Sequence, residues 1–488
     1  MQNPRMMTYR RLLLCGALLA LAVGCGERAS TPEPVSQPPD HWWTYGTHLP
    51  PEPQRPGDPE KGWELLIHEG YVGCGLPASA FPLLKYVTPV TPNDVLPDRT
   101  GPGANFPYKW NHHVTDAGVE LAVPNCLMCH AERFNGELVI GLGDVTSDYT
   151  ADFAEVSKLV DFLEPIQDQL FTPEEQAELS KFVSRIRKLG GGTRMRTVGT
   201  NPANIIGVKL FSFLDRDTLQ WSEEPLLDLP ADEPIPIVPP PWWRTGIKSS
   251  SFYNGMGRGA HQQIMMAASA LCVDDVSHVE KIDAYFHHVN AFISALEPPA
   301  YPFAIDEEQA AHGEHVFNAN CAGCHGTYGD NRSYPNLVIP LSVIATDPVY
   351  AAGAPLLSDF IDWYNDSIYG REARLEPNTG YVAPPLDGIW ATAPYFHNGS
   401  VPTIAHVLKS ASRPRFWKRV DFDSTNFDET NLGWPYEELP YGQARAPVEE
   451  RKYIYDTLQL GHWNTGHTFG DHLTRRERSA VLEYLKTL

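Results

Sequence analysis

The stretch Asn125-Cys126-Leu127-Met128-Cys129-His130 lies in the first third of the chain, and Asn320-Cys321-Ala322-Gly323-Cys324-His325-Gly326 follows much later. Each contains Cys-x-x-Cys-His, the sequence form of a covalent c-type haem attachment site. The two thiols can reach the two vinyl groups of one porphyrin, and the histidine that follows is placed to bind the iron. The sequence therefore predicts two covalently bound haem c groups, with the second axial ligand of each iron still to be found.

A zinc site is the alternative interpretation of a Cys-x-x-Cys pair. Structural zinc needs four ligands, and neither motif has a second cysteine pair or a His-x3-5-His partner to complete a tetrahedron. The spacing and the repetition in one chain favour haem.

Length and charge limit the remaining possibilities. The 488 residues are too many for one small cytochrome domain and predict two to three domains. The formal net charge of −22 argues against nucleic-acid binding, which requires a basic face. An acidic protein of this kind suits a small basic redox partner protein.

The N-terminus is expected to be a targeting segment. Basic residues precede the apolar run 12–23, so residues 1–24 are predicted to be a signal peptide. The run ends at Gly24-Cys25, which resembles a bacterial lipobox with Cys25 as the lipidated residue. The alternative is a plain secretory signal with an incidental cysteine. We expect a lipid-anchored linker over 25–60 and a periplasmic or cell-envelope location, with the outer membrane favoured over the inner one.

Cysteine counting leaves one open pair. Of the eight cysteines, Cys15 falls in the signal peptide, Cys25 takes the lipid and four hold haem, which leaves Cys74 and Cys272. In an oxidising compartment they can form a disulfide. Two buried free thiols are the alternative.

The pattern of apolar residues and helix caps predicts a mainly α fold. Helices are expected at 172–189, 277–296 and 306–320, with a last helix from Thr474, each with capping or amphipathic signals. The third helix leads straight into Cys321, as in a class I cytochrome c.

The predicted architecture is two class I cytochrome c-like haem domains with long loops and insertions. The N-terminal haem domain is placed at 61–300 and the C-terminal cytochrome c domain at 301–488, with an insertion at about 411–460.

The methionines restrict the ligands of the second iron. No methionine follows Met266, so the C-terminal haem has no methionine from its own domain. Histidine is then the expected sixth ligand, which lowers the expected potential relative to methionine. His467, in the loop before the last helix, is the preferred ligand. The other downstream histidines are His397, His406, His462 and His472.

The distal side of the first haem stays open between a protein ligand and none. Met195, Met256, Met265, Met266 and His261 are the possible ligands. The segment 241–261 contains Trp242, Trp243, Phe252 and a glycine-rich turn before His261, which suits the wall of a haem pocket. A packed loop with core aromatic residues is the alternative.

A longer string now adds a family resemblance. Pro384-Pro-Leu-Asp-Gly-Ile-Trp390-Ala-Thr-Ala-Pro-Tyr-Phe-His-Asn-Gly-Ser-Val-Pro-Thr403 and the two haem motifs resemble the dihaem cytochrome c peroxidase superfamily, which includes the tryptophan-tryptophylquinone maturase and the dihaem rubber oxygenases. The haem spacing and the Pro-Trp-Trp segment resemble the rubber oxygenase branch most.

The resemblance implies roles for particular residues. The haem of His130 would be the reactive centre, and the haem of His325 would be a six-coordinate electron relay with His467 as its second ligand. The bridging tryptophan of the family would fall on Trp242 or Trp243. Two further positions are implied: Phe252 corresponds to a distal phenylalanine, and His397 has a supporting role.

These observations predict an exported haem oxidoreductase, peroxidase- or oxygenase-like, that activates H2O2 or O2 at the N-terminal haem. His261 could serve a peroxidase as acid or base, whereas an oxygenase would prefer an apolar face such as Phe252. The alternatives are a non-catalytic periplasmic electron-transfer dihaem cytochrome c and a haem-based gas-binding module.

Overall fold

The computed structural model describes residues 35–488, except 39, 81–93, 153–156, 159, 162, 163, 191 and 229–232. The predicted signal peptide and Cys25 lie outside the described residues. Val35 to Leu488 form one compact unit. No helix among the described residues has both the length and the apolar character to cross a membrane.

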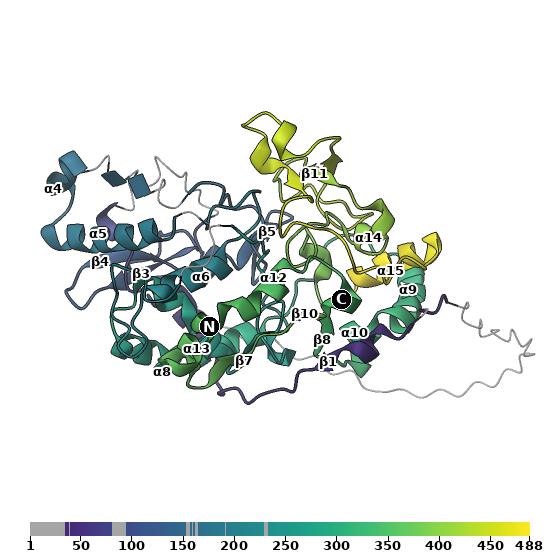
Figure 1. The fold of residues 1–488 in the computed structure, drawn as a ribbon, viewed down its shortest axis with the longest axis horizontal. Coiled ribbons are helices and arrows are strands. Elements are labelled where there is room, and N and C mark those ends of the chain that lie inside the picture. The colour runs from purple at the N-terminus through teal and green to yellow at the C-terminus, as the bar shows by residue number, and fades with distance from the viewer. Residues whose placement is uncertain are drawn as a thin grey trace, which may run out of the picture. The chain divides into compact units, whose positions relative to one another are not determined.

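Helices and short strands are both spread along the whole of this unit (Figure 1). The α-helices are α1 (Pro59–His68), α4 (Gln167–Leu170), α5 (Pro173–Lys188), α6 (Ala203–Ser212), α7 (His261–Met265), α8 (Val276–Ala295), α9 (Glu307–Asn320), α10 (Ala322–His325), α11 (Leu341–Ile344), α12 (Val349–Gly353), α13 (Ser358–Asp366), α14 (Ile404–Val407) and α15 (Arg475–Lys486). The strands are β1 (Thr47–His48), β2 (Leu76–Pro77), β3 (Trp110–Val114), β4 (Glu120–Pro124), β5 (Ala131–Phe134), β6 (Glu137–Ile140), β7 (Gly257–Gly259), β8 (Leu337–Pro340), β9 (Ala373–Leu375), β10 (Gly380–Val382), β11 (Phe416–Arg419), β12 (Tyr436–Glu438) and β13 (Tyr455–Asp456).

The long helices form where capping and periodicity predicted them. Thr172 caps α5 and Thr474 caps α15, each in a reciprocal capping box with the glutamate three positions on. The carboxylate of Asp306 caps α9 by accepting the Gln309 N–H. Helix α8 buries the face that carries Val279, Phe286 and Val289 and the residues in register with them, as its apolar spacing indicated.

The prediction of a mainly α fold with two class I cytochrome c-like domains is wrong. The described residues form three three-stranded and two two-stranded sheets, and two separate cytochrome c domains are not evident. The first haem motif follows β4 and precedes β5, so no helix delivers it. The hairpin β5–β6 turns at Asn135-Gly136, with φ of +49° and +83°. Asn-Gly between strands is the strongest short-range hairpin signal, and the sequence reasoning overlooked it.

Two sheets join distant parts of the chain. Strand β7 pairs with β9, and β1 pairs with β8, which also pairs with β10. The larger core likewise combines α1 and α8 with residues 354–375 around α13. Packing between the first and second halves is therefore part of the fold itself, and this is why two independent haem domains do not form.

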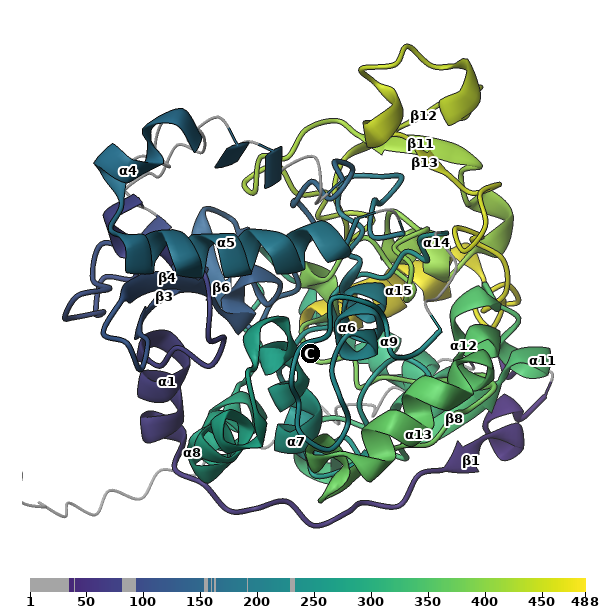
Figure 2. The same cartoon turned by 60° about the vertical axis from the view of Figure 1, so that its left-hand side comes forward.

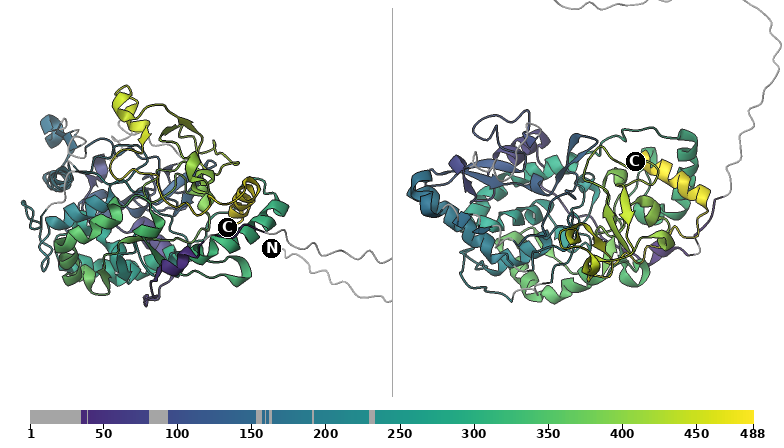
Figure 3. Two further views of the ribbon diagram at one scale, coloured as in Figure 1. Left: turned by 45° about the vertical axis from the view of Figure 1, so that its right-hand side comes forward. Right: turned by 90° about the horizontal axis from the view of Figure 1, so that it is seen from above.

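Two packing contacts support the haem motifs. Helix α5 lies alongside the β2–β4–β3 sheet, where Leu179 and Val183 pack with Leu76 (Figure 2). Helices α9 and α15 lie side by side (Figure 3). At their contact a Cβ on Gly313 would lie 1.9 Å from the Ala480 carbonyl oxygen, so only glycine permits this approach.

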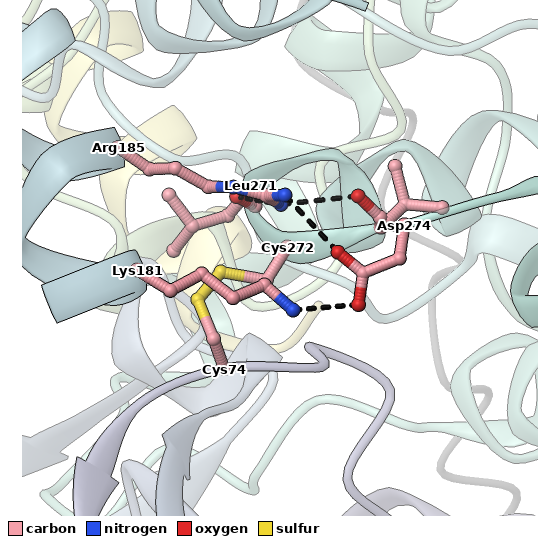
Figure 4. The surroundings of a disulfide bond; sticks show 7 residues. Cys74, Lys181, Arg185, Leu271, Cys272 and Asp274 are labelled. Atoms are coloured by element: carbon pink, nitrogen blue, oxygen red, sulfur yellow. Dashed lines mark hydrogen bonds and ion pairs between the residues drawn. A yellow bond between two sulfur atoms is a disulfide. The ribbon is translucent and has the colours of Figure 1, made fainter. Parts of the chain in front are cut away.

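Cys74 and Cys272 form a disulfide, with their Cα atoms 5.4 Å apart (Figure 4). The bond links the segment just before β2 to the segment before α8. Beside it, Lys181 and Arg185 of α5 both form ion pairs with Asp274. The disulfide and these ion pairs connect α5, the β2 sheet and α8 on the side of the molecule that carries the first motif.

Candidate haem sites

The first Cys-x-x-Cys-His is held by a tight turn rather than by a long helix. Residues Cys126–Met128 form one 3-10 turn, and the Asn125 side chain caps it by accepting the Leu127 N–H at 2.9 Å. The Asn125 amide also donates to the Tyr108 carbonyl at 2.8 Å. The Cys126 N–H donates to the Tyr71 hydroxyl at 2.6 Å. These hydrogen bonds fix the turn to Tyr71, which precedes β2, and to Tyr108, which precedes β3.

None of the four motif cysteines takes part in a disulfide. Burial raises the pKa of Cys126 to about 11, of Cys321 to about 12 and of Cys324 to about 11. Burial also raises the pKa of Cys129, against the hydrogen bond that its sulfur accepts from Asn201. The four sulfurs are thus available for thioether attachment, and the described residues contain no group of three or more His, Cys, Asp or Glu side chains that could hold a zinc ion.

His130 of the first motif faces a large cavity. Its ring stacks on Trp242, with centroids 4.7 Å apart and an interplanar angle of 21°. Burial lowers the pKa of His130 to about 4, against the Pro240 carbonyl, which acts in the opposite direction. The imidazole is therefore neutral at neutral pH, as coordination to a metal requires.

The cavity has a volume of about 1900 Å³ and is lined by Cys126, Cys129 and His130. Ligand pockets are usually about 300–1,000 Å³, so there is room for a porphyrin and for a further molecule. Its walls are mainly apolar side chains from many elements, among them Phe182, Ile186, Ile205, Val208, Met256, Ile264, Met265, Phe286, Leu357, Phe360 and Tyr364. At its edge Phe252, Leu356 and Leu460 remain 46%, 83% and 46% exposed.

The second motif begins where α9 ends. Cys321 is the C-cap of α9, and α10 contains the remaining four residues to His325. Gly326 follows with φ +83°, and a Cβ there would lie 2.0 Å from the Ser333 carbonyl oxygen. A Cβ on Gly323, between the two cysteines, would lie 2.2 Å from the Trp43 ring. The segment expected to be a linker thus contributes Trp43 to this site.

His325 and His467 face each other. The Nδ1 of His325 lies 2.8 Å from the Pro384 carbonyl oxygen, so Nδ1 must be the donor and Nε2 is left with its lone pair. The His325 and His467 rings have centroids 6.3 Å apart. Two imidazoles bound to one metal at about 2 Å from opposite sides have ring centres roughly 6 Å apart. The two rings therefore fit one metal atom between them.

Both rings have the protonation state that a metal needs. Burial lowers the pKa of His467 to about 3, with His325 and Arg413 acting in the same direction. Burial also lowers the pKa of His325, opposed by the Pro384 carbonyl. The loop of His467 is fixed by its N–H, which donates to the Ile344 carbonyl at 2.7 Å. The ring also packs on Phe469, with centroids 4.9 Å apart.

The other downstream histidines have different neighbours. The His397 Nε2 lies 3.1 Å from the Tyr381 hydroxyl, and the two rings stack. The rings of His406, His462 and His472 are within hydrogen-bond distance of the Thr403 hydroxyl, the Leu460 carbonyl and the Asn320 amide oxygen, respectively. Among the described residues, His467 is the histidine whose ring lies beside the ring of His325.

The residues predicted from the segment 241–261 lie in three different environments. Trp242 and Phe252 line the cavity. Trp243 is 2% exposed in the second core, and its Nε1 donates to the Asp387 carbonyl at 2.6 Å. The His261 ring nitrogens lie 3.2 Å from the Ser251 hydroxyl and 3.1 Å from the Lys248 carbonyl oxygen, and the ring is not among the residues that line the cavity.

Some structural contributors went unrecognised in the sequence. Trp43 belongs to Trp42-Trp43, an aromatic pair that the Pro-rich composition around it obscured. Asp387 accepts hydrogen bonds from Arg244 at 2.9 Å and Arg332 at 2.7 Å, beside Trp243. No local pattern marks these two arginines, because they are far apart in sequence from each other and from Asp387.

One part of the chain matches a family of cytochrome c-like proteins. Residues 380–418, which include the β10 strand, His397 and Arg413, match the family described as RoxA-like, cytochrome c-like. This match supports a relationship to the rubber oxygenase-like cytochromes and implies haem c and a haem-containing oxidoreductase.

Two curated relatives, both from Sinorhizobium fredii, are similar to parts of the chain. The uncharacterized protein y4iM is 33% identical over 222 residues, covering 41% of this chain and 50% of the relative. The uncharacterized protein y4iJ is 28% identical over 291 residues, covering 45% of this chain and 46% of the relative. The chain thus spans about half the length of the curated relatives it matches.

Proposed function

We propose that the chain is an exported dihaem c-type oxidoreductase. Residues 126–130 would hold the haem that activates O2 or H2O2, and residues 321–325 would hold the haem that relays electrons. Haem c supplies an iron that changes oxidation state and, where a coordination position is open, binds an oxidant. The observation that carries the proposal is the difference between the two histidines: His130 faces a cavity of about 1900 Å³, whereas His325 faces His467.

The cavity walls favour an oxygenase over a peroxidase. A peroxidase needs an acid or base above its reactive haem, and His261 has both ring nitrogens beside other protein atoms. Phe252, Met256 and Phe286 present apolar surface to the same space. Such walls exclude water from the reacting groups and accept an apolar organic substrate through the partly exposed edge.

A short route of protein groups joins the two motifs. Trp242 stacks on the first-motif histidine, and the next residue, Trp243, donates its Nε1–H to the Asp387 carbonyl. Asp387 follows three positions after Pro384, whose carbonyl accepts from the second-motif histidine. Electrons would travel along this route, with the indole rings as the polarisable segment. Asp387 holds the end of the route in place through its contacts with two arginines.

A lipid anchor at Cys25 and an envelope location belong to the same proposal. The apolar run 12–23 before Gly24-Cys25 and the disulfide in the folded region support export to an oxidising compartment. The net charge of −22 suits a small basic protein as electron donor. Labelling of the cells with radioactive palmitate would mark the wild-type protein, and Cys25→Ser would abolish the label.

The non-catalytic electron carrier remains the second candidate because of two methionines. Met256 and Met265 both border the cavity, and a thioether permanently bound to the first iron would close it to oxidants. The Met256→Leu and Met265→Leu variants separate the two functions. An electron carrier would change from low-spin to high-spin at the first haem in one of them, whereas the oxidoreductase would keep its spectrum in both.

The main test is optical and EPR titration of the purified full-length holoprotein with O2 and, separately, with H2O2. With H2O2 the proposal predicts that the high-spin ferric EPR signal of the first haem disappears, and with O2 that the optical spectrum of the reduced protein changes at the first haem. The second haem should keep its low-spin spectrum in both titrations. Two low-spin haems that stay inert to both oxidants in every redox state would refute the oxidoreductase. A stable O2 complex that is released unchanged would instead identify a gas-binding module.

A further inference from the structure

We propose that Arg413 is a positioning residue that holds the His467 loop in place and thereby sets the strength of axial ligation, and that its positive charge raises the reduction potential of the second haem. This rests on the proposed function in one respect, namely that His467 is the second axial ligand opposite His325.

Arg413 binds the main chain of the loop that contains His467. Its Nη1 donates to the carbonyl oxygens of Asn464 at 2.8 Å and Gly466 at 2.6 Å. Its Nη2 donates to the carbonyl oxygen of His467 itself at 3.0 Å. One planar guanidinium therefore fixes three carbonyls within four consecutive residues, and lysine cannot reproduce this arrangement of donors.

The other edge of the same guanidinium is attached to a rigid element. The Arg413 Nε donates to the His406 carbonyl at 2.9 Å, and Nη2 donates to the Val407 carbonyl at 3.2 Å. Both carbonyls belong to α14, whose Ile404 is buried in the second core. Arg413 thus links the His467 loop to α14 and the second core, in the way that hydrogen-bond partners outside a metal site orient its histidine ligands.

The loop has a conformation that needs such support. Gly466 has φ +71° and His467 has φ +43°, so His467 adopts a left-handed conformation that residues with a Cβ disfavour. Gly466 also passes close to the main chain of Ala345, where a Cβ would lie 2.1 Å from the carbonyl carbon. Without the hydrogen bonds from Arg413, this loop is expected to relax and move the His467 ring away from His325.

Arg413 also brings a positive charge to the site. A guanidinium keeps its positive charge in proteins at neutral pH. The guanidinium lies over the Phe396 ring at 5.0 Å, and that ring is 5.9 Å from the His467 ring. A nearby cation favours the iron state of lower positive charge. Arg413 therefore raises the reduction potential of the second haem, against the lowering expected from two histidine ligands.

Cyanide binding to the ferric holoprotein tests the positioning role, because cyanide competes with His467 for the second iron. The two haems are followed separately by their EPR signals. In Arg413→Met we expect the second haem to bind cyanide roughly 10- to 100-fold more tightly than in the wild type, the range seen when outer partners of metal ligands are removed. Its reduction potential, measured by spectroelectrochemistry, should fall.

Arg413→Lys separates geometry from charge. Lysine keeps the cation but loses the fork of donors, so cyanide affinity should rise as in the methionine variant while the potential stays near that of the wild type. Arg99→Met is the matched control. Arg99 also donates to main-chain carbonyls, those of Trp110 at 2.8 Å and Phe106 at 3.3 Å among them. Its loss should leave cyanide affinity and potential of the second haem unchanged.

His467→Ala distinguishes failure of this inference from failure of its premise. If His467→Ala keeps the low-spin signal of the second haem, the ligation itself is refuted. If His467→Ala loses that signal but Arg413→Lys binds cyanide with wild-type affinity, the positioning role of Arg413 is refuted. The lysine variant suffices for this decision even where the methionine variant does not fold.

Discussion

The two Cys-x-x-Cys-His motifs have the same five-residue pattern and opposite surroundings. Residues 126–130 lie between two short strands and open onto a wide apolar cavity. Residues 321–325 follow a 14-residue helix and face His467 across 6.3 Å. The motif itself determines how the porphyrin is attached and which histidine binds one face. The opposite face is determined by residues from distant parts of the chain, and these differ between the two sites.

Removing one pair of cysteines at a time is the strongest way to break this comparison. Cys126→Ala with Cys129→Ala, and Cys321→Ala with Cys324→Ala, should each halve the covalent haem measured by pyridine haemochrome assay. Only the first pair should also lose the high-spin EPR signal. If the second pair removes the high-spin signal instead, the assignment of the open site to residues 126–130 is wrong.

The disulfide should stabilise the side of the molecule that carries the first motif. Cys74→Ser with Cys272→Ser removes a covalent link between residues 198 positions apart, and we expect the free energy of unfolding to fall by about 2 to 4 kcal/mol. Urea unfolding followed by the signals of both haems measures this. If the fold is one cooperative unit, both signals shift together. A shift confined to the second haem would contradict the location of the bond.

Acid stability gives a smaller effect with a defined direction. Burial lowers the pKa of His397 from 6.5 to about 3, so the folded state stays neutral while the unfolded chain binds a proton. The stability that the neutral His397 contributes is fully present above the unfolded pKa of 6.5, and it is lost as the pH falls from there toward 3. Protonation of one such histidine in the unfolded chain lowers the free energy of unfolding by about 1.4 kcal/mol between neutral pH and about pH 5.5.

His397→Gln should therefore lose about 1.4 kcal/mol less stability over that interval than the wild type. Urea unfolding at both pH values measures the difference. The amide keeps a polar group near the Tyr381 hydroxyl, which limits the direct loss at neutral pH. An acid loss equal to that of the wild type would show that His397 is protonated in the folded protein.

Local signals in the sequence predicted local structure well. The capping boxes at Thr172 and Thr474 marked helix starts because their side chains bond to main-chain groups only three positions away. The Asn135-Gly136 turn carried an equally local signal for a hairpin and was overlooked. The sequence pointed to His467 because the absence of downstream methionine left few ligands for the second iron. The two rings lie 6.3 Å apart, and their ligation of one iron stays a prediction.

Local sequence signals could not predict the cavity, or the larger core that combines both halves of the chain. The cavity walls combine side chains from Tyr71 to Leu460, so no window of sequence contains its pattern. Strand pairings such as β7–β9 depend on two three-residue segments that are too short to show alternation. The hydrogen bonds of Arg413 go to carbonyl oxygens, and a main-chain partner leaves no mark in the sequence of the loop that it holds.

The two capping boxes offer the smallest and most evenly matched test. Thr172→Ala affects α5, whose Phe182, Val183 and Ile186 form part of the cavity wall. Thr474→Ala affects α15, which packs on α9 at the second motif. Each change should lower the free energy of unfolding by about 1 kcal/mol, because one N-terminal N–H loses its partner. Urea unfolding of both variants measures this loss.

Hydrogen exchange then shows in which region the main-chain amides exchange faster when each cap is removed. Thr172→Ala should increase exchange in α5 and leave the α9–α15 pair as in the wild type, and Thr474→Ala should do the reverse, because local opening involves the helix that lost its cap. The variant Thr474→Ser keeps the cap and serves as the control. If both alanine variants open the same region, the two motifs share one unit of local stability, and the difference between them lies only in the groups that face each iron.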